Sequence, residues 1–356
     1  MNILITVDPE IPVPPKLYGG IERIVEMLIN GLVAKGHHVF LMANKDSTVN
    51  CSLIPFKGQS SFSKKDTLDN IFQIVQVVKQ YQIDVIHSFS RLKYLSFLLR
   101  KNIPKIMSYQ REPSLKGIKI ASKLSKKETL HFTGCSNYIA NQIKTVANAT
   151  CIYNGAVSNL YSPNFECNEK GYLVFLGRIE EIKGTHIAIE IALKSNKDLI
   201  IAGNVPNDKV SKKYYEEKVA PFLQLPNIKY IGPVNDIEKN KLLRGAYAFL
   251  MPIQWNEPFG IVMAEALASG TPILAFPMGS VPEVVQNGIN GFICNTTQDM
   301  IEKMTAINTL DREKVYHTFL QNFSDTVIVN AYENLYTKMV KKYQETKTKN
   351  NKKWEF

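Results

Sequence analysis

The sequence has few cysteines and no long apolar run. Its 356 residues include only five cysteines, none of them in a Cys-x-x-Cys pair, so neither a zinc site nor a disulfide framework is indicated. The longest strictly apolar run is six residues, Ala246–Met251, whereas a membrane span needs roughly 20. The apolar start of the chain has no basic segment and soon meets Asp8 and Glu10, which predicts a strand rather than a signal peptide. We therefore expect a cytoplasmic protein.

Several ligand-binding signatures are also missing. No Gly-x-Gly occurs, which excludes the dinucleotide fingerprint, and there is no Walker loop. The segment 134–138 lacks the final glycine of a nucleophile elbow. No Asp-x-Asp occurs, so the short carboxylate motif that binds a metal–diphosphate is absent and no metal site is expected.

The composition is that of a folded protein with an uneven charge. Apolar residues make up 45% and charged residues 21%, and the length favours two domains. The net charge is +11. Residues 1–165 hold 20 Lys and Arg against 10 Asp and Glu, whereas residues 166–330 hold 16 against 19. The basic first half suggests an anionic partner on that side.

Short apolar bursts alternate with longer amphipathic stretches, a pattern that predicts βαβ units and parallel sheets. We expect two doubly wound α/β domains, 1–165 and 166–330, facing each other across a cleft, and a helical segment 331–356 with a frayed basic tail. Ligands of such sheets bind outside the carboxyl ends of the strands. The polar stretch 161–170 is the expected linker, and a helix is expected over Ile21–Lys35. The expected strands are 2–7, 38–43, 85–88, 105–108, 131–135 and 150–153, then 172–176, 199–202, 228–231, 248–252, 272–276 and 291–294.

One candidate site lies in the segment 256–272. Pro258 and Gly260 indicate a turn into a short helix, whose free N–H groups suit a phosphate. Glu257 precedes this helix and Glu265 lies within it, and a carboxylate there can accept hydrogen bonds from a ribose diol. The alternative interpretation is a capping carboxylate and a solvated helix glutamate.

Two further loops carry suitable groups. Arg178 and Lys183 follow the expected strand 172–176 and can clamp a diphosphate, unless they only pair with the adjacent glutamates. Gly19 and Gly20 open a helix after a proline-rich loop and let backbone amides approach an anion. The alternative there is a plain strand–helix connection.

Taken together, the motifs resemble glycosyltransferase family 4, retaining nucleotide-sugar transferases with the GT-B fold. The matching segments, in family order, are "YGGIERIVEMLINGLVAKGHHV", "VIHSFS", "GCSNYIANQI", "IYNGAV", "FLGRIEEIKG", "EPFGIVMAEALASGTPILA" and "VPEVVQNGINGF". The resemblance implies an acceptor-side domain 1–165, a donor-binding domain 166–330 and a C-terminal helix that packs back on the first domain.

The resemblance also implies roles for individual residues. Arg178 and Lys183 would clamp the donor diphosphate, Glu257 would lie near the transferred sugar and Glu265 would bind the ribose. Backbone and turn contacts to the donor would come from Gly19, Gly20, Gly203, Val234, Phe259, Gly260 and Ile261. No cofactor is implied, because the nucleotide-sugar is a substrate and the cations replace a metal.

The sequence departs from the family at two places, and in one of them Met278-Gly279 replaces the usual Gly-Gly. The other departure concerns a histidine. Many members carry a histidine after the strand that matches 105–108, where this chain has Gln110. Gln110 can hydrogen-bond a sugar hydroxyl but cannot take a proton at neutral pH. His87, at the end of a neighbouring strand, could point into the cleft instead, unless it is only a strand-end histidine bonded to the backbone.

The acceptor side carries a basic face. If 115–127 is helical, five lysines share one arc, which is typical of a membrane-surface helix or of a merely solvated face. These are Lys116, Lys119, Lys123, Lys126 and Lys127.

The prediction is therefore a hexosyltransferase that uses a UDP-sugar, or next GDP-mannose, and a glycan, lipid-linked or small-molecule acceptor in polysaccharide or cell-envelope synthesis. No nucleic-acid partner is expected, and the protein would be cytoplasmic with peripheral contact to the inner membrane face. A nucleotide-sugar epimerase on the same fold and a non-catalytic nucleotide-sugar-binding protein are the alternatives.

Overall fold

The structure is a computed structural model that describes residues 1–15, 19–166 and 171–352, with side chains up to residue 345. The chain divides into two units, one made of Met1–Tyr153 and the segment from Asp325 onward, the other of Asn154–Ser324. The division thus comes at Tyr153 and Asp325 rather than at residues 165 and 330. Ala156 pairs with Ser324 in an isolated bridge, which keeps both ends of the second unit together. Part of the expected linker, 167–170, lies outside the described residues.

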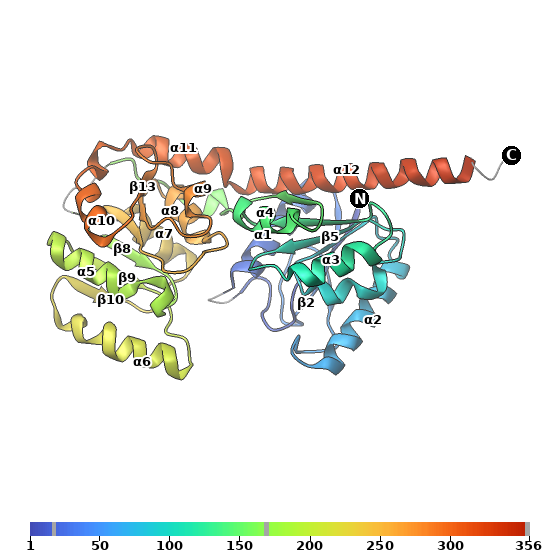
Figure 1. Cartoon of the computed structure of the whole chain (residues 1–356), viewed down its shortest axis with the longest axis horizontal. Helices are drawn as coiled ribbons and strands as arrows, with labels where there is room; N and C mark the ends of the chain where they lie inside the picture. Colours follow the sequence, from blue (N-terminus) through green and yellow to red (C-terminus); the bar gives the residue numbers. More distant parts are fainter. Residues whose placement is uncertain (16–18, 167–170, 353–356) are drawn as a thin grey trace. The chain divides into compact units, whose positions relative to one another are not determined.

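The first unit contains a seven-stranded sheet in the order β3-β2-β1-β4-β5-β6-β7, with every pairing parallel. Figure 1 shows this unit in blue and green together with the red helix α12. Its strands are β1 (Asn2–Thr6), β2 (His38–Ala43), β3 (Ser52–Pro55), β4 (Val85–Ser88), β5 (Lys105–Tyr109), β6 (Leu130–Gly134) and β7 (Ala149–Cys151). Its helices are α1 (Gly20–Ala34), α2 (Lys64–Gln80), η1 (Leu92–Leu98), α3 (Leu115–Leu124), α4 (Asn137–Lys144) and α12 (Asp325–Lys352).

The helix α1 shows how the sequence pattern produces this packing. Its apolar residues recur at helical spacing, and Ile24, Leu28 and Leu32 are completely or almost completely buried. The helix ends before Gly36, which adopts a positive φ of 80°. The buried stripe therefore fixes which face of α1 packs inward.

The second unit repeats the architecture with a six-stranded parallel sheet in the order β10-β9-β8-β11-β12-β13. Its strands are β8 (Leu173–Leu176), β9 (Leu199–Ala202), β10 (Ile228–Tyr230), β11 (Ala248–Met251), β12 (Ile273–Ala275) and β13 (Gly291–Ile293). Its helices are η2 (Ser158–Leu160), η3 (Glu181–Lys183), α5 (Thr185–Ser195), α6 (Lys209–Lys218), η4 (Ala220–Gln224), α7 (Asp236–Arg244), α8 (Ile261–Ala268), α9 (Val281–Val284), α10 (Thr297–Met304), η5 (Ile307–Thr309) and α11 (Arg312–Asn322).

Both sheets reverse their strand order at one point. In the first sheet the reversal lies between β1 and β4, and in the second it lies between β8 and β11. At such a switch point the two loops after the strands diverge to opposite faces and leave a crevice at the carboxyl edge, where ligands bind. The fold thus defines one preferred site in each unit.

The long helix α12 packs against α1 of the first unit. Glu333 forms ion pairs with Lys35 at 2.8 Å and with His37 at 2.9 Å. Tyr332 and Tyr336 are fully buried. None of the helices in the described ranges has the length and hydrophobicity of a bilayer-spanning segment.

Candidate active site

The donor residues expected in the second unit follow neighbouring strands of its sheet. Arg178 and Lys183 come after β8, and Glu257 comes after β11, so they flank the switch point. Gly203 follows β9 and Val234 follows β10. Because all strands of this sheet run parallel, these residues share its carboxyl edge.

Lys183 and Glu257 form a partly buried ion pair at this edge. The Lys183 Nζ lies 2.5 Å from Glu257 Oε2, and Trp255 Nε1 donates to the same oxygen at 2.9 Å. The ammonium also lies 5.0 Å from the centre of the Trp255 ring. Glu257 is only 9% exposed. Two side chains from the loop after β11, Glu257 and Trp255, therefore hold the Lys183 ammonium in place, and the contribution of Trp255 was not foreseen from the sequence.

Arg178 has a different partner. Its Nη1 lies 2.9 Å from Glu180 Oε1, and its side chain is 31% exposed. Arg178 thus pairs with an adjacent glutamate, whereas Lys183 pairs with Glu257 from another loop. A guanidinium carries five N–H donors in a planar fork, and such a fork suits the oxygens of a diphosphate.

The two loops are fixed against each other by their backbones. Gln254 N donates to Ile182 O at 2.8 Å. Gly184 has a φ of 77°, and a Cβ there would overlap the carbonyl oxygen of Pro252. Only glycine suits both the left-handed conformation and this close approach. The position of Lys183 is therefore set by the backbone as well as by its ion pair.

The helix α8 begins beside Glu257, as the turn residues predict. Gly260 is its N-cap residue, and Ile261 is its first residue. Ser280 Oγ donates to Phe259 O at 3.0 Å, and Ser280 N donates to Glu257 O at 2.9 Å. The Phe259 ring is buried. The first N–H groups of α8 thus start at the same edge as Lys183, where a helix N-terminus stabilises an anion.

Glu265 lies inside the protein rather than on a solvated face. It is 4% exposed, and its Oε1 accepts a hydrogen bond from Lys239 Nζ of α7 at 2.6 Å. Lys239 also contacts Asp236 at 3.1 Å. The solvated-glutamate alternative is therefore wrong, and any ribose bound by Glu265 would share the carboxylate with Lys239, a residue that sequence reasoning missed.

Gly203 and Val234 lie in the loops next to these groups. Gly203 N donates a hydrogen bond to Gly232 O at 2.9 Å, and Gly203 O accepts one from Tyr230 Oη at 2.8 Å. Val234 is half-buried just before α7, whose N-cap Asn235 forms a capping box with Glu238. The turn ahead of α7 is thereby held rigidly.

Gly19 and Gly20 belong to the first unit. A Cβ at Gly19 would approach Pro15 Cβ to 2.5 Å and Glu22 Oε2 to 2.7 Å, so no side chain fits there. Gly20 is the first residue of α1. Residues 16–18, which include the tyrosine of the motif, lie outside the described residues.

The prediction that His87 could point into the site is wrong. His87 is fully buried in β4; its Nδ1 lies 2.6 Å from Tyr336 Oη and its Nε2 lies 2.6 Å from Ser108 Oγ. Burial lowers the pKa of His87 to about 3. Its partners are side chains, one of them from α12, so it serves the packing of the first unit. Gln110, in contrast, lies just beyond β5 and lines a cavity of that unit.

The basic face is shorter than predicted. The helix α3 ends at Leu124, because Ser125 adopts an extended backbone conformation, so Lys126 and Lys127 follow the helix rather than extend it. All five predicted lysines are exposed. Of the apolar residues on the other side, Ile118 and Ala121 are buried, whereas Leu115, Ile120 and Leu124 are exposed.

Within the described residues, no group of three or more His, Cys, Asp or Glu side chains is placed to hold a metal ion. The charged groups placed at the carboxyl edge of the second sheet include the cations Arg178, Lys183 and Lys239 and the carboxylates of Glu180, Glu257 and Glu265. Such a set can neutralise a diphosphate and accept hydrogen bonds from hydroxyl groups.

Two family models match the chain. The model described as "Glycosyl transferases group 1" matches residues 162–326, and the one described as "Glycosyltransferase Family 4" matches residues 18–157. A relative from Klebsiella pneumoniae, described as an uncharacterized 42.6 kDa protein in the cps region, is 29% identical over 254 residues. That match covers 67% of this chain and 63% of the relative, slightly less than two thirds of its length.

Solved structures show the same fold. A glycosyltransferase from Rickettsia africae superposes with a TM-score of 0.79 at 19% identity, over 96% of this chain and 98% of that one. HepE from Anabaena, solved in complex with UDP-glucose, gives a TM-score of 0.73 at 17% identity, over 95% of this chain and 100% of that one. The two family models cover both units, and the fold is GT-B: the chain belongs to glycosyltransferase family 4.

Proposed function

We propose that the protein transfers a hexose from a nucleotide-sugar, most favourably a UDP-sugar and next GDP-mannose, to a hydroxyl of a glycan or lipid-linked acceptor. The observation that carries this proposal is the position of the Lys183–Glu257 pair and of Arg178, on both sides of the second switch point and beside the start of α8.

The charges suit the chemistry of sugar transfer. Breaking the sugar–diphosphate bond leaves negative charge on the departing oxygen and positive character on the anomeric carbon. Arg178, Lys183 and the first N–H groups of α8 would stabilise that negative charge, and losing one such donor typically costs about 10²–10³ in rate. With these groups in place, the reaction needs no metal ion.

Retention of configuration requires no separate protein base. In a same-face substitution the acceptor hydroxyl attacks the anomeric carbon on the side from which the phosphate departs, so that phosphate can receive the proton of the hydroxyl. Glu257 would keep Lys183 aligned and lie beside the sugar, while Glu265 would accept hydrogen bonds from the ribose. The turn at Val234 would contact the nucleobase of the donor.

The relatives favour the same donor and pathway class. HepE was crystallised with UDP-glucose, and the Klebsiella relative is described as a protein in the cps region. We extend these descriptions to this chain as a proposed UDP-sugar donor and a role in polysaccharide or cell-envelope synthesis. The exposed lysines of α3 support a peripheral contact with an anionic membrane surface.

The test is a thermal-shift screen against UDP-, GDP-, ADP- and dTDP-sugars in the presence of a chelator, followed by turnover with and without acceptor. The proposal expects stabilisation by a UDP-sugar and sugar transfer that depends on acceptor. Conversion of the donor into an epimeric nucleotide-sugar without acceptor would establish an epimerase instead. Stabilisation without any turnover, across a panel of acceptors, would establish a binding protein.

A further inference from the structure

The first unit contains a cavity that the donor site does not use. Its volume is about 500 Å³, within the size range of small-molecule sites. It lies between η1 and α3, and residues that follow β4 and β5 form its rim. The carboxyl end of β4 is also one side of the first switch point, where a ligand is expected.

The interior of this cavity is apolar. Two of its lining residues, Ile120 and Leu124, are 50% and 46% exposed although they are large and apolar. Exposed apolar side chains that gather around one hollow indicate a ligand with an apolar part. The apolar lining comes mainly from Leu92, Leu99, Met107, Ile120, Ala121 and Leu124.

The rim of the cavity is basic. Arg91, Lys93 and Arg111 line it, against a single carboxylate, Glu112. The Glu112 carboxylate accepts a hydrogen bond from Tyr138 Oη at 2.5 Å. Among the residues that the structure describes, Lys93 Nζ donates to two neutral oxygens, Ser61 O at 3.1 Å and Thr67 Oγ1 at 3.0 Å.

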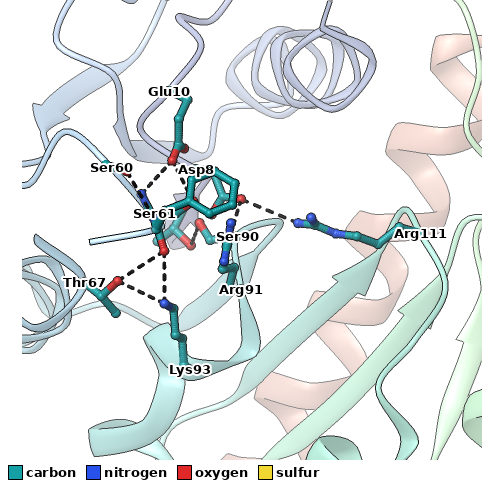
Figure 2. A network of polar contacts seen from close by, with 11 residues as sticks. Asp8, Glu10, Ser60, Ser61, Thr67, Ser90, Arg91, Lys93 and Arg111 are labelled. Atoms are coloured by element: carbon teal, nitrogen blue, oxygen red, sulfur yellow. Dashed lines mark hydrogen bonds and ion pairs between the residues drawn. The ribbon is translucent and has the colours of Figure 1, made fainter. Parts of the chain in front are cut away.

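The two arginines are held near each other by one partly buried carboxylate, Asp8 (Figure 2). Arg111 Nη2 lies 3.5 Å and Arg91 Nε lies 3.9 Å from Asp8 Oδ2, longer than charge-assisted hydrogen bonds. Asp8 Oδ1 and Arg91 Nε have no hydrogen-bond partner within the described ranges. The guanidinium of Arg91 also lies 4.4 Å from the centre of the Phe62 ring.

Both guanidinium side chains stay partly exposed at the rim, Arg111 to 56% and Arg91 to 30%. The two guanidinium groups share one carboxylate, that of Asp8. Burial raises the pKa of Asp8, so this carboxylate is protonated more easily than that of an exposed aspartate. Glu10, the other carboxylate of the network, is occupied by Ser61 N and Oγ, both at 2.6 Å. A ligand group with two or more oxygens and a negative charge can accept hydrogen bonds from the guanidinium groups of both Arg91 and Arg111.

We propose that this cavity binds an acceptor that joins an apolar chain or ring to a phosphate, with the phosphate on Arg91 and Arg111 and the apolar part against Ile120 and Leu124. The inference rests on the proposed function, because it names the chemical class of the acceptor. It does not rest on the donor site: the cavity and its rim lie within the first unit.

The test uses isothermal titration with n-octyl phosphate, n-octyl glucoside and inorganic phosphate. n-Octyl phosphate should bind at least about tenfold more tightly than either partial probe, since it alone offers both features. Tight binding of inorganic phosphate alone would show a site for free phosphate and overturn the proposal. Equal binding of the glucoside and n-octyl phosphate would show that the cations are not used and overturn it as well.

Matched variants locate the binding. Arg111→Gln should weaken n-octyl phosphate about tenfold or more and leave the glucoside unchanged, and Ile120→Asp should weaken both amphiphiles. Lys119→Gln and Leu115→Asp, exposed residues of α3 outside the cavity lining, are the controls and should change neither. An equal loss of n-octyl phosphate binding in the variants and in the controls would contradict the assignment of the binding site to this cavity.

The two proposals can fail separately. UDP binding should be the same in Arg111→Gln as in the parent protein. If UDP-sugars bind and turn over but n-octyl phosphate does not bind, the acceptor inference alone is wrong. If n-octyl phosphate binds as described but no nucleotide-sugar is turned over, the proposed function is wrong and the cavity remains an amphiphile site.

Discussion

Lys183 is the residue on which the donor chemistry depends most. Its ammonium is fixed by Glu257, by the Trp255 ring and by the backbone approach at Gly184. The substitution Lys183→Ala should lower turnover by about 10²-fold or more, because one preorganised charge is lost. Steady-state kinetics of this variant beside Lys194→Ala, an exposed lysine of α5, provide the measurement. Comparable rates in both variants would remove Lys183 from the site.

Glu265 should act on nucleotide binding rather than on the fold alone. The substitution Glu265→Gln removes a charged acceptor, and a hydrogen bond to a charged group contributes about 1.5–3 kcal/mol. We therefore expect UDP to bind roughly 10- to 100-fold more weakly, as measured by titration calorimetry. Glu190→Gln, an exposed carboxylate of α5, is the matched control. Unchanged UDP affinity in Glu265→Gln would refute the ribose assignment.

The residues of the site differ in how far the sequence could predict them. Lys183, Glu257 and Glu265 stand at fixed spacings next to turn residues, but the local pattern alone also allows ordinary ion pairs and caps, and the resemblance to the family is what selects them. Trp255 and Lys239 have no such local signal, since each acquires its role only when another loop or helix packs against it. The prediction for His87 was wrong because its burial also depends on a distant residue: it contacts Tyr336, which lies far along the chain.

At the scale of elements, the parallel strands follow the apolar pattern closely. Every expected strand corresponds to a strand of the structure, with bounds that differ by a residue or two. The strand β3 (Ser52–Pro55) was missed because it is a half-exposed edge strand that ends in proline, so it has neither an apolar run nor clean alternation. The helix α3 ended early because nothing in the local lysine pattern specifies the extended Ser125.

The contact of α12 with β4 makes the first unit sensitive to acid. Burial lowers the pKa of His87 to about 3, whereas an unfolded histidine titrates near 6.5. Between these values the unfolded state binds the extra proton, so stability falls as the pH drops below about 6.5 and is unaffected above it. His87 alone should remove about 2 kcal/mol of unfolding free energy between pH 6.5 and 5.

Urea denaturation at several pH values measures this effect. The acid-dependent loss should be smaller in His87→Gln than in the parent protein, even if that variant is less stable at pH 7. His317→Gln, which alters an exposed histidine of α11, should keep the parental slope. An unaltered slope in His87→Gln would mean that other groups cause the acid sensitivity.

The helix α3 and the residues after it predict binding to anionic surfaces. Each lysine near such a surface contributes roughly 1 kcal/mol, and salt screens the attraction. The protein should sediment with anionic liposomes at low salt and be released at high salt. Changing Lys119, Lys123 and Lys126 to Glu should abolish binding, whereas the same change at the exposed Lys209, Lys212 and Lys213 should not. Failure of the parent protein to sediment would leave the lysines as a solvated face.

At the scale of the whole molecule, the two units share the same sheet topology over six strands and differ in the loops that follow their strands. Each sheet reverses its order after the first strand of its unit, and each reversal has charged loops on both sides. The repeated alternation of strands and helices was enough to predict two parallel sheets. The boundaries between the units could not be predicted in this way. They depend on the bridge between Ala156 and Ser324, which lie far apart in the sequence, and local composition does not indicate such a pairing.

The proposed function depends on one property of the second unit, the binding of a nucleoside diphosphate at its switch point through Arg178 and Lys183. The most direct measurement is calorimetric titration of UDP, with EDTA present, into the parent protein and the double variant Arg178→Ala/Lys183→Ala. UDP should bind to the parent protein without metal and about 100-fold or more weakly to the double variant. Equal affinity in both proteins, or binding that appears only when a divalent metal is added, would contradict this prediction.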